Sequence, residues 1–382
     1  MAKYKLGDIC EIVSGSTPKT SIEEYWDGDI KWITPAEIND DTYIVTDSVR
    51  KITDLGAKKT GLSPFPEGTV ILSSRAPIGK VAIAGCAMCC NQGFKNLICS
   101  EKILNKYLYW FLKGNTSFLN SLGRGATFKE ISKSIVSQIE INVPDIECQK
   151  EAVDILEKVS EVISLRKQEL TALDDLIKAR FVEMFGDLRM NTKGWSVKTF
   201  DKLSYLITDG EHSTPRRIAE GVYLLSARNI LNHSLQLEDV DYIDKEEYDR
   251  IAKRVVPQEG DVLISCSGTV GRCCSAPADV KFQMVRSVAL IRFKEEINHV
   301  FAEYMITSDY LQEQIKGSQT VSAQANLFQG KIKALKGFVP PIELQNQFAD
   351  FVRQVDKSKV AVQKALDETQ MLFDSLMQKY FM

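Results

Sequence analysis

Polar loops that combine hydroxyl groups, glycines and basic side chains occur in three matched pairs along this 382-residue chain. The pairs lie at residues 14–19 and 209–217, at 73–80 and 265–272, and at 123–129 and 317–322. Hydroxyl groups and backbone amides can hold phosphate groups, and an arginine can donate two hydrogen bonds to one guanine edge. A single loop of this kind is usually only a turn, but three matched pairs indicate a surface that binds nucleic acid.

Basic and hydroxyl side chains in or near these loops are the candidate DNA contacts. They are Ser16, Thr17, Lys19, Arg75, Lys80, Arg124, Lys129, Ser213, Thr214, Arg216, Arg217, Arg228 and Arg272. Some of the basic residues are expected to form structural ion pairs instead, because only their charge and loop position select them. The net charge of −3 requires that any DNA-binding face be a local patch rather than a whole domain.

No residue pattern for catalysis accompanies the loops. Adenine methyltransferases need an Asn/Asp-Pro-Pro-Tyr/Phe loop, and the Pro-Pro pair at 340–341 lacks the acidic or amide residue before it. The Gly-Lys pair at 79–80 lacks the first glycine and the final hydroxyl of a P-loop. Asp145, which could begin a nuclease motif, fits better as a residue that compensates a helix dipole. With three scattered histidines, no Ser/His/Asp group can be assembled, and we predict no catalytic residue.

The nine cysteines are odd in number and irregular in spacing, which favours reduced thiols over a disulfide framework. Cys86 and Cys89 have the spacing of a zinc-binding pair. A closed zinc site needs four ligands, usually from a second close pair, and Cys273 and Cys274 are adjacent in sequence. We therefore predict buried thiols and no metal.

The hydrophobic fraction of 44% and charged fraction of 26% are typical of a globular protein of two or three domains. No stretch approaches about eighteen consecutive apolar residues, so no membrane segment is predicted. The first residues contain no apolar core of a signal peptide. We therefore expect a cytoplasmic protein.

An internal repeat organises the chain. Val143-Pro-Asp-Ile-Glu-Cys-Gln149 recurs as Val339-Pro-Pro-Ile-Glu-Leu-Gln345, at an offset of 196 positions that holds without insertion to the C-terminus. Upstream, Glu67-Gly68 and Glu259-Gly260 match at an offset of 192, so the loops between differ in length. The repeat predicts a first globular domain, a long helix, a second globular domain and a second long helix. Their expected bounds are 1–143, 144–186, 187–339 and 340–382.

After each of these motifs, apolar residues recur at alternating spacings of three and four residues. This pattern predicts two long helices. Neither glycine nor proline interrupts residues 149–185 or 345–382. A helix of some forty residues spans about 60 Å and cannot bury its apolar seam alone. The simplest arrangement is an antiparallel coiled coil of the two helices. The alternative is that each helix folds back onto its own domain.

Four large apolar residues fall outside the expected seam: Ile155, Phe181, Phe351 and Met377. They are expected to be exposed and available to a partner protein. The globular parts contain short apolar runs bounded by Gly, Pro, Asn and Asp, which indicate strands, with short helices near 104–113 and 299–308. The predicted fold class is α+β, with two β-rich domains in tandem and a long helix after each.

The chain resembles the specificity (S) subunit of Type I restriction-modification systems over essentially its whole length. The resemblance rests on Phe65-Pro-Glu-Gly-Thr-Val-Ile-Leu-Ser-Ser-Arg-Ala-Pro-Ile-Gly-Lys80, on Asn91-Gln-Gly-Phe-Lys-Asn-Leu97 and on the two Val-Pro-x-Ile-Glu-x-Gln motifs. The second copy is more degenerate: Cys266-Ser-Gly-Thr-Val-Gly271 replaces the Arg-Ala-Pro-Ile-Gly stretch, and Gln283 stands for Gln92.

The resemblance implies a non-catalytic subunit in which each globular domain reads one half of a bipartite double-stranded DNA target. The helices would set the spacer between the halves and dock two modification subunits. Those partners would use S-adenosylmethionine to methylate adenine, and restriction subunits would supply ATP- and magnesium-dependent cleavage. The alternative is a coiled-coil protein scaffold without DNA readout. A self-sufficient DNA enzyme is disfavoured by the missing motifs.

Overall fold

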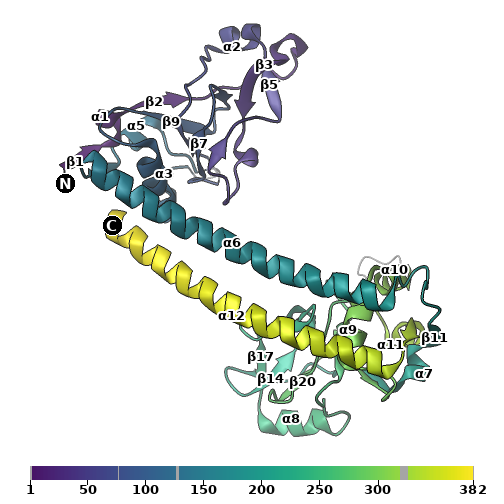
Figure 1. Ribbon diagram of the computed structural model, residues 1–382. Coiled ribbons are helices and arrows are strands. Elements are labelled where there is room, and N and C mark those ends of the chain that lie inside the picture. The colour runs from purple at the N-terminus through teal and green to yellow at the C-terminus, as the bar shows by residue number, and fades with distance from the viewer. Residues whose placement is uncertain (1, 76, 126–128, 319–325, 382) are drawn as a thin grey trace. The chain divides into compact units, whose positions relative to one another are not determined.

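The computed structural model describes residues 2–75, 77–125, 129–318 and 326–381. The chain divides into two compact units, of which unit 1 comprises Met1–Lys167 and Lys364–Met382 and unit 2 comprises Gln168–Gln363. Each unit holds one β-rich globular part together with about half of each long helix (Figure 1). The predicted α+β class, with two such parts and two long helices, is confirmed.

Unit 1 is built on a five-stranded sheet in the order β2-β9-β6-β7-β4. These strands are β2 (Cys10–Ser14), β9 (Phe94–Cys99), β6 (Val70–Ser73), β7 (Val81–Ala84) and β4 (Ile44–Val45). All residues of β6 and β7 are buried, as expected for central strands covered on both faces. A smaller sheet has the order β5-β3-β8, from β5 (Arg50–Ile52), β3 (Trp26–Ile33) and β8 (Cys89–Cys90). The strands β1 (Ala2–Lys5) and β10 (Glu140–Val143) pair separately.

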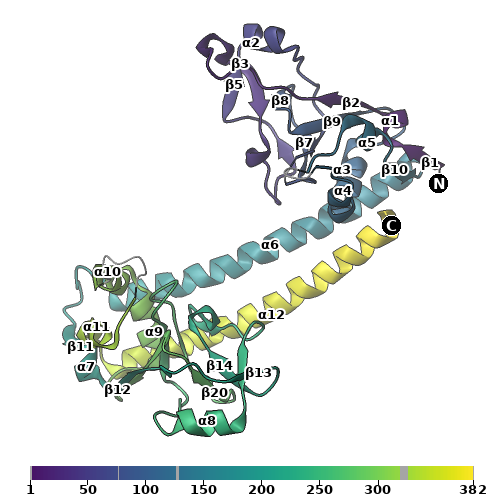
Figure 2. The same ribbon diagram turned by 180° about the vertical axis from the view of Figure 1, so that it is seen from behind.

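The helices of unit 1 connect and cover these sheets. They are α1 (Leu6–Ile9), α2 (Asp54–Thr60), α3 (Asn105–Gly114), α4 (Thr116–Ser121) and α5 (Lys133–Ser137), with 3-10 turns η1 (Glu23–Tyr25) and η2 (Pro35–Glu37). Six consecutive residues of α3, from Tyr107 to Leu112, are buried in one core with the β6 and β2 strands. Figure 2 shows α3 and α4 beside the start of the first long helix.

Unit 2 repeats this plan with two four-stranded sheets. The first has the order β12 (Ser204–Asp209), β21 (Val288–Phe293), β18 (Val262–Ser265) and β19 (Cys273–Ser275). The second has the order β13 (Arg217–Ile218), β17 (Asp241–Ile243), β14 (Val222–Leu225) and β20 (Phe282–Met284). Two further pairs are β15 (Ile230–Leu231) with β16 (Ser234–Leu235), and β11 (Ser196–Thr199) with β22 (Lys336–Val339).

The shorter helices of unit 2 also follow the plan of unit 1. They are α7 (Phe200–Leu203), α8 (Lys245–Ala252), α9 (His299–Thr307), α10 (Asp309–Ser318) and α11 (Gln329–Ala334), with the 3-10 turn η3 (Ala227–Asn229). Strand register shows the correspondence directly. Val70 of β6 lies opposite Leu97 of β9, and Val262 of β18 lies opposite Ile291 of β21.

The two long helices are α6 (Ile146–Phe185) and α12 (Ile342–Phe381), and each contains 40 residues. Asp145 accepts a hydrogen bond from the backbone N–H of Cys148 at 2.9 Å, so it caps the start of α6, where the sequence predicted a residue that compensates the helix dipole. This hydrogen bond lowers the pKa of the Asp145 carboxyl. No helix in the described ranges is both long enough and apolar enough to cross a bilayer.

Opposite ends of the two helices meet within each unit. In unit 1, Leu156 near the start of α6 shares a core with Met377 near the end of α12. In unit 2, Phe181 near the end of α6 shares a core with Phe348 near the start of α12. The pairing is therefore antiparallel, and the alternative that each helix packs only on its own domain is wrong.

The expected exposure of the four apolar residues outside the seam was only partly right. Ile155 is 39% exposed, but Phe181 and Met377 are each only 5% exposed. Phe181 stacks on Phe301 of α9 with ring centroids 5.7 Å apart. Each helix packs on a globular part as well as on the other helix, so its buried arc is wider than a two-helix seam.

Candidate nucleic-acid interface

The described residues of the turns at 73–80 and 265–272 form matching hydrogen bonds in the two units. In unit 1 the buried Ser73 hydroxyl donates to Pro77 O at 2.7 Å and accepts from Lys80 N at 2.9 Å. In unit 2 the Ser265 hydroxyl donates to Thr269 O at 2.7 Å and accepts from Arg272 N at 3.0 Å. The serines therefore hold the turn, and the following basic residue occupies the same position in both units.

Gly79 and Gly271 have φ values of 96° and 90°, a backbone conformation that a residue with a Cβ rarely adopts. This requirement explains why the glycine is kept although the residues before it differ. The side chain of Lys80 donates to the backbone carbonyl of Pro35 at 2.9 Å, so it is partly engaged in the fold. Arg272 is half-buried and has no carboxylate partner among the described residues.

Three further backbone hydrogen bonds are repeated in the two units, and they align the loops in front of the sheets. Ser16 N donates to Cys90 O in unit 1, as Glu211 N donates to Met284 O in unit 2. Asn91 N donates to Ile33 O, as Val285 N donates to Leu225 O. Ser74 N donates to Gly93 O, as Cys266 N donates to Ser287 O. Gln92 and Arg286 therefore occupy equivalent positions. The expected match of Gln283 to Gln92 is wrong, because β20 register places Gln283 at the position of Cys89.

In unit 1, charged side chains fill the site beside the hydrogen bond from Ser74 N to Gly93 O. Lys95 is 7% exposed, and its Nζ lies 3.3 Å from Ser74 Oγ and 3.4 Å from Glu130 Oε1. The other oxygen of Glu130 accepts from Arg75 Nε at 3.0 Å. Beside this cluster, the Thr17 hydroxyl donates to Oε1 of Gln92, whose side chain is exposed.

In unit 2 the same site is open. Lys95 of β9 lies opposite Leu72 of β6, and Ala289 of β21 lies opposite Ile264 of β18. Lys95 and Ala289 therefore occupy corresponding positions in the two units. The bonds from Ile131 N to Ser74 O and from Leu327 N to Cys266 O show that Glu130 corresponds to Asn326. At this site unit 2 has a cavity of about 730 Å³, and Asn326 is among the residues that line it. The two units thus share one backbone frame and differ in the side chains that fill it.

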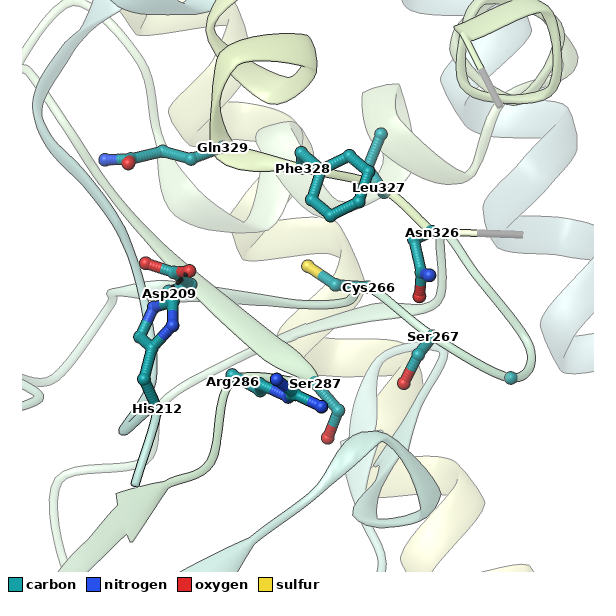
Figure 3. Close-up of a pocket in the computed structure, with 11 residues that line it drawn as sticks. Asp209, His212, Cys266, Ser267, Arg286, Ser287, Asn326, Leu327, Phe328 and Gln329 are labelled. Carbon is teal, nitrogen blue, oxygen red and sulfur yellow. Dashed lines mark ion pairs between the residues drawn. The ribbon is translucent and has the colours of Figure 1, made fainter. Parts of the chain in front are cut away.

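Polar groups from several elements surround this cavity (Figure 3). Asp209 and His212 lie on one side, Gln329 and Phe328 on another, and Arg286 and Ser287 along a third. Asp209 is paired with His212 at 2.8 Å. A second cavity of about 400 Å³ has His212, Ser267, Arg286 and Ser287 in common with the first. The described residues contain no group of three or more His, Cys, Asp or Glu side chains arranged to hold a metal.

Several predicted DNA contacts are held in ion pairs. Arg75 pairs with Glu130 at 3.0 Å, Arg217 with Asp241 at 2.9 Å, and Arg228 with Asp241 at 3.2 Å. Arg216 pairs with Asp244 and raises its own pKa by doing so. The sequence predicted that some of these residues would be structural partners, and their role in DNA binding stays a prediction.

The remaining candidates lie at or near the surface. Lys19, Arg124, Lys129 and Thr214 are exposed, and Ser16 and Thr17 are half-buried in front of β8. The Ser213 hydroxyl donates to Glu211 and lowers the pKa of that carboxyl. Ser213, Thr214 and Arg217 line the second cavity. Residues 126–128 and 319–322 of the third loop pair lie outside the described residues.

Arg286, His212, Asn326 and Gln329 were missed as candidate site residues. A signal for Arg286 was present, because it precedes β21 by the same two residues that separate Gln92 from β9. The other three could not be found in this way, because their place in the site depends on which loops the fold brings together. Among the cysteines, Cys266 lines the cavity, and burial raises the pKa of its thiol to about 12. All nine cysteines are free.

Comparison with known proteins assigns the chain to a family. The family profile described as "Type I restriction modification DNA specificity domain" matches residues 1–174 and 217–369. The chain is 34% identical over 232 residues to the Type I restriction enzyme MjaIX specificity subunit of Methanocaldococcus jannaschii, covering 56% of this chain and 54% of that protein. It is 24% identical over 382 residues to the EcoprrI specificity subunit of Escherichia coli, covering 92% and 86%.

The chain thus spans about half the length of the MjaIX subunit that it matches. Two solved structures share the fold. The S subunit from M. genitalium has a TM-score of 0.58 at 14% identity, covering 100% of this chain and 96% of that one. A chain from a structure of assembly and conformational transition in the type I R-M system has a TM-score of 0.62 at 18% identity, covering 99% and 97%. The resemblance seen in the sequence is confirmed, and this chain belongs to the family of Type I restriction-modification specificity proteins.

Proposed function

We propose that this chain is the non-catalytic DNA sequence-specificity subunit of a Type I restriction-modification complex. Each β-rich part reads one half of a bipartite DNA target. The observation that carries the proposal is the site built twice on one backbone frame. It holds Gln92, Lys95 and Glu130 in unit 1 and Arg286, Ala289 and Asn326 in unit 2. Two readers with one frame and different side chains are suited to two different half-sites.

The long helices support a spacer role. A straight helix of 40 residues would span about 60 Å, and one turn of DNA advances about 34 Å. Two antiparallel helices of equal length are suited to set the spacing between two half-sites on the DNA. The expected spacer is therefore a fixed number of unread base pairs.

The chemistry in this proposal belongs to partner proteins. Two modification subunits would dock on the helices and use S-adenosylmethionine to methylate adenine. Restriction subunits would add ATP- and magnesium-dependent cleavage, and the complex would work in the cytoplasm. One solved structure with the same fold concerns complex assembly of the type I R-M system, which supports the expectation of such partners.

Exchange of the second reader tests the proposal. Residues 187–339 would be replaced by the corresponding part of another family member, and the complex with modification subunits would be assayed by mapping methylated adenines in bulk genomic DNA. We expect one half of the recognised sequence to change and the other half to persist. A change in both halves, or in neither, would contradict independent reading.

A protein scaffold without DNA readout predicts a different result. Band shifts of the assembled complex would be measured on duplex DNA over a series of salt concentrations. A DNA reader that contacts phosphates loses affinity steeply as salt rises. The absence of any salt-dependent DNA binding would favour the scaffold.

A further inference from the structure

Arg286 differs from nearly every other arginine of unit 2 in having no acidic partner. Within the described part of that unit, only Arg272 and Arg286 lack a carboxylate within ion-pair distance. Arg272 is half-buried, whereas Arg286 is exposed. Arg286 also lies where the two cavities meet, since it lines both. A guanidinium in this position has its five donors available to a ligand.

The acidic groups around Arg286 are already engaged with other cations or hydroxyls. Asp209 accepts from Arg254 at 2.8 Å and pairs with His212 at 2.8 Å. Glu211 accepts from Ser213 N at 3.0 Å and lies 3.6 Å from Arg250. Neither carboxylate therefore needs Arg286 as its counter-ion.

The backbone of Arg286 is held by two neighbouring segments. Arg286 N donates to Glu211 O at 2.9 Å, and Val285 N donates to Leu225 O at 2.9 Å. On the other side, Ser287 Oγ accepts from Ala227 N at 3.0 Å. Because the backbone is already fixed, binding has to order only the side chain of Arg286, which favours specific contacts.

From these observations we infer that Arg286 is a specificity-determining residue that reads a guanine in the second half-site. The equivalent residue Gln92 reads an adenine in the first. An arginine fork matches O6 and N7 of guanine, and a glutamine amide matches N6 and N7 of adenine. The Thr17 hydroxyl orients Gln92 by donating to its Oε1, which keeps a second lone pair for the base. This inference rests on the proposed function and names the base that each position selects.

Reciprocal substitutions test the inference in the assembled complex. The complex of the full chain with its modification subunits would methylate a library of duplex DNA with randomised flanks, and methylated molecules would be sequenced. Arg286→Gln is expected to change one position of the second half-site from guanine to adenine. Gln92→Arg is expected to make the opposite change in the first half-site. The preference at each position should shift by roughly 10- to 100-fold.

The matched control is Lys253→Gln, which removes one exposed positive charge outside both cavities. It should leave the recognised sequence unchanged. Folding of each variant would be checked by its thermal unfolding, because a misfolded variant would lower methylation of every sequence equally. Arg286→Ala provides a second variant that should relax the guanine position rather than convert it.

The outcomes separate this inference from the proposed function. Arg286→Gln could leave the recognised DNA sequence unchanged, weaken binding to all sequences equally and reduce the slope of log affinity against log salt concentration by about 1. Arg286 would then contact a phosphate, and the inference would be wrong. An unchanged sequence with unchanged affinity also overturns it. In both cases the wild-type complex still selects a bipartite sequence. If the wild-type complex selects no sequence, the proposed function itself fails.

Discussion

Gln149 Oε1 accepts a hydrogen bond from the backbone N–H of Leu104 at 2.8 Å, and this contact joins the start of α6 to the globular part of unit 1. The amide nitrogen of the same side chain donates to Lys102 O at 3.0 Å and to Pro144 O at 2.9 Å. In unit 2, Gln345 makes the same three bonds, to Asn298 N and to the carbonyls of Glu296 and Pro340. Both glutamines are 0% exposed.

This geometry predicts that Gln149→Leu and Gln345→Leu each destabilise their unit. Each replacement leaves one backbone N–H and two carbonyls of the helix junction without a side-chain partner. Buried groups left unpaired in this way cost about 1–3 kcal/mol each, so for three groups we expect a loss of at least about 3 kcal/mol in the free energy of unfolding. Chemical denaturation followed by helix content would measure it.

The control for this pair is Gln354→Leu, at an exposed position of α12. A surface substitution of this kind should change the free energy of unfolding by less than about 0.5 kcal/mol. If Gln149→Leu cost no more stability than the control, the prediction would be wrong. The glutamine that ends both Val-Pro-x-Ile-Glu-x-Gln motifs would then need an explanation other than these hydrogen bonds.

A second prediction concerns the buried Lys95 of unit 1. Glu130→Gln removes the carboxylate that neutralises the Lys95 ammonium, which then has only neutral partners such as the Ser74 hydroxyl and the Phe94 carbonyl. We expect a loss of about 2 kcal/mol, less than for a fully buried pair because the Glu130 side chain is 35% exposed. Adding Lys95→Met should restore most of that stability, since it removes the unpaired charge. Urea denaturation of the two single variants and the double variant would measure the coupling.

Arg75→Gln serves as the comparison, because Arg75 contacts the same carboxylate from a side chain that is 47% exposed. Its loss should cost less than about 1 kcal/mol. A double variant no more stable than Glu130→Gln alone would show that the unpaired ammonium is not the source of the cost.

The long helices could be predicted from the sequence because α6 and α12 each keep their apolar spacing without glycine or proline. The burial of Phe181 and Met377 could not, because it depends on α9 and α3, which lie far away in the sequence. The candidate loops were found by their composition. The ion pairs of Arg216, Arg217 and Arg228 were not found, since their acidic partners come from residues 239–244.

The cavity of unit 2 illustrates the same limit. Asn326 lines it where the other copy has Glu130, and the backbone hydrogen bonds of the neighbouring residues were needed to align the two. The composition of the second half alone gives no sign of that exchange. The sequence nevertheless predicted that the two copies carry different side chains on related loops, and this difference underlies the proposed reading of two half-sites.

A third prediction concerns the free thiols. Burial raises the pKa of Cys89 to about 11 and that of Cys90 to about 12, so almost none of either thiol is ionised at pH 8. Cys148 is exposed at the start of α6, although its hydrogen bond to Asp145 raises its pKa too. Iodoacetamide at pH 8 should label Cys148 first, as followed by mass spectrometry of peptides.

Labelling in urea provides the control, because all nine thiols should react once the chain unfolds. Equal rates of labelling for Cys90 and Cys148 in the folded protein would contradict the burial of the Cys90 thiol in β8.

The last prediction is a pH dependence in unit 2 that arises from Asp356 of α12. Partial burial raises the pKa of Asp356 above its ordinary value of 3.8, although 53% of the side chain is exposed, and Lys359 opposes that shift from 3.8 Å. His233 also lowers it, whereas Glu303 and Asp174 raise it. Because the native carboxyl binds a proton more readily than the unfolded one, the free energy of unfolding decreases as pH rises through the raised native pKa.

Asp356→Asn removes this cost and leaves Lys359 paired with Asp174 at 2.6 Å. The variant should therefore be more stable than the parent at pH 7, and the difference should shrink as pH falls toward the ordinary carboxyl range. Thermal unfolding from pH 4 to pH 8 would measure it, with Asp350→Asn as the control, since Asp350 is a similarly exposed carboxylate of α12 that pairs with Arg353 instead. A variant that is less stable than the parent at pH 7 would show that the attraction of Lys359 and His233 outweighs the cost of burying the Asp356 carboxylate.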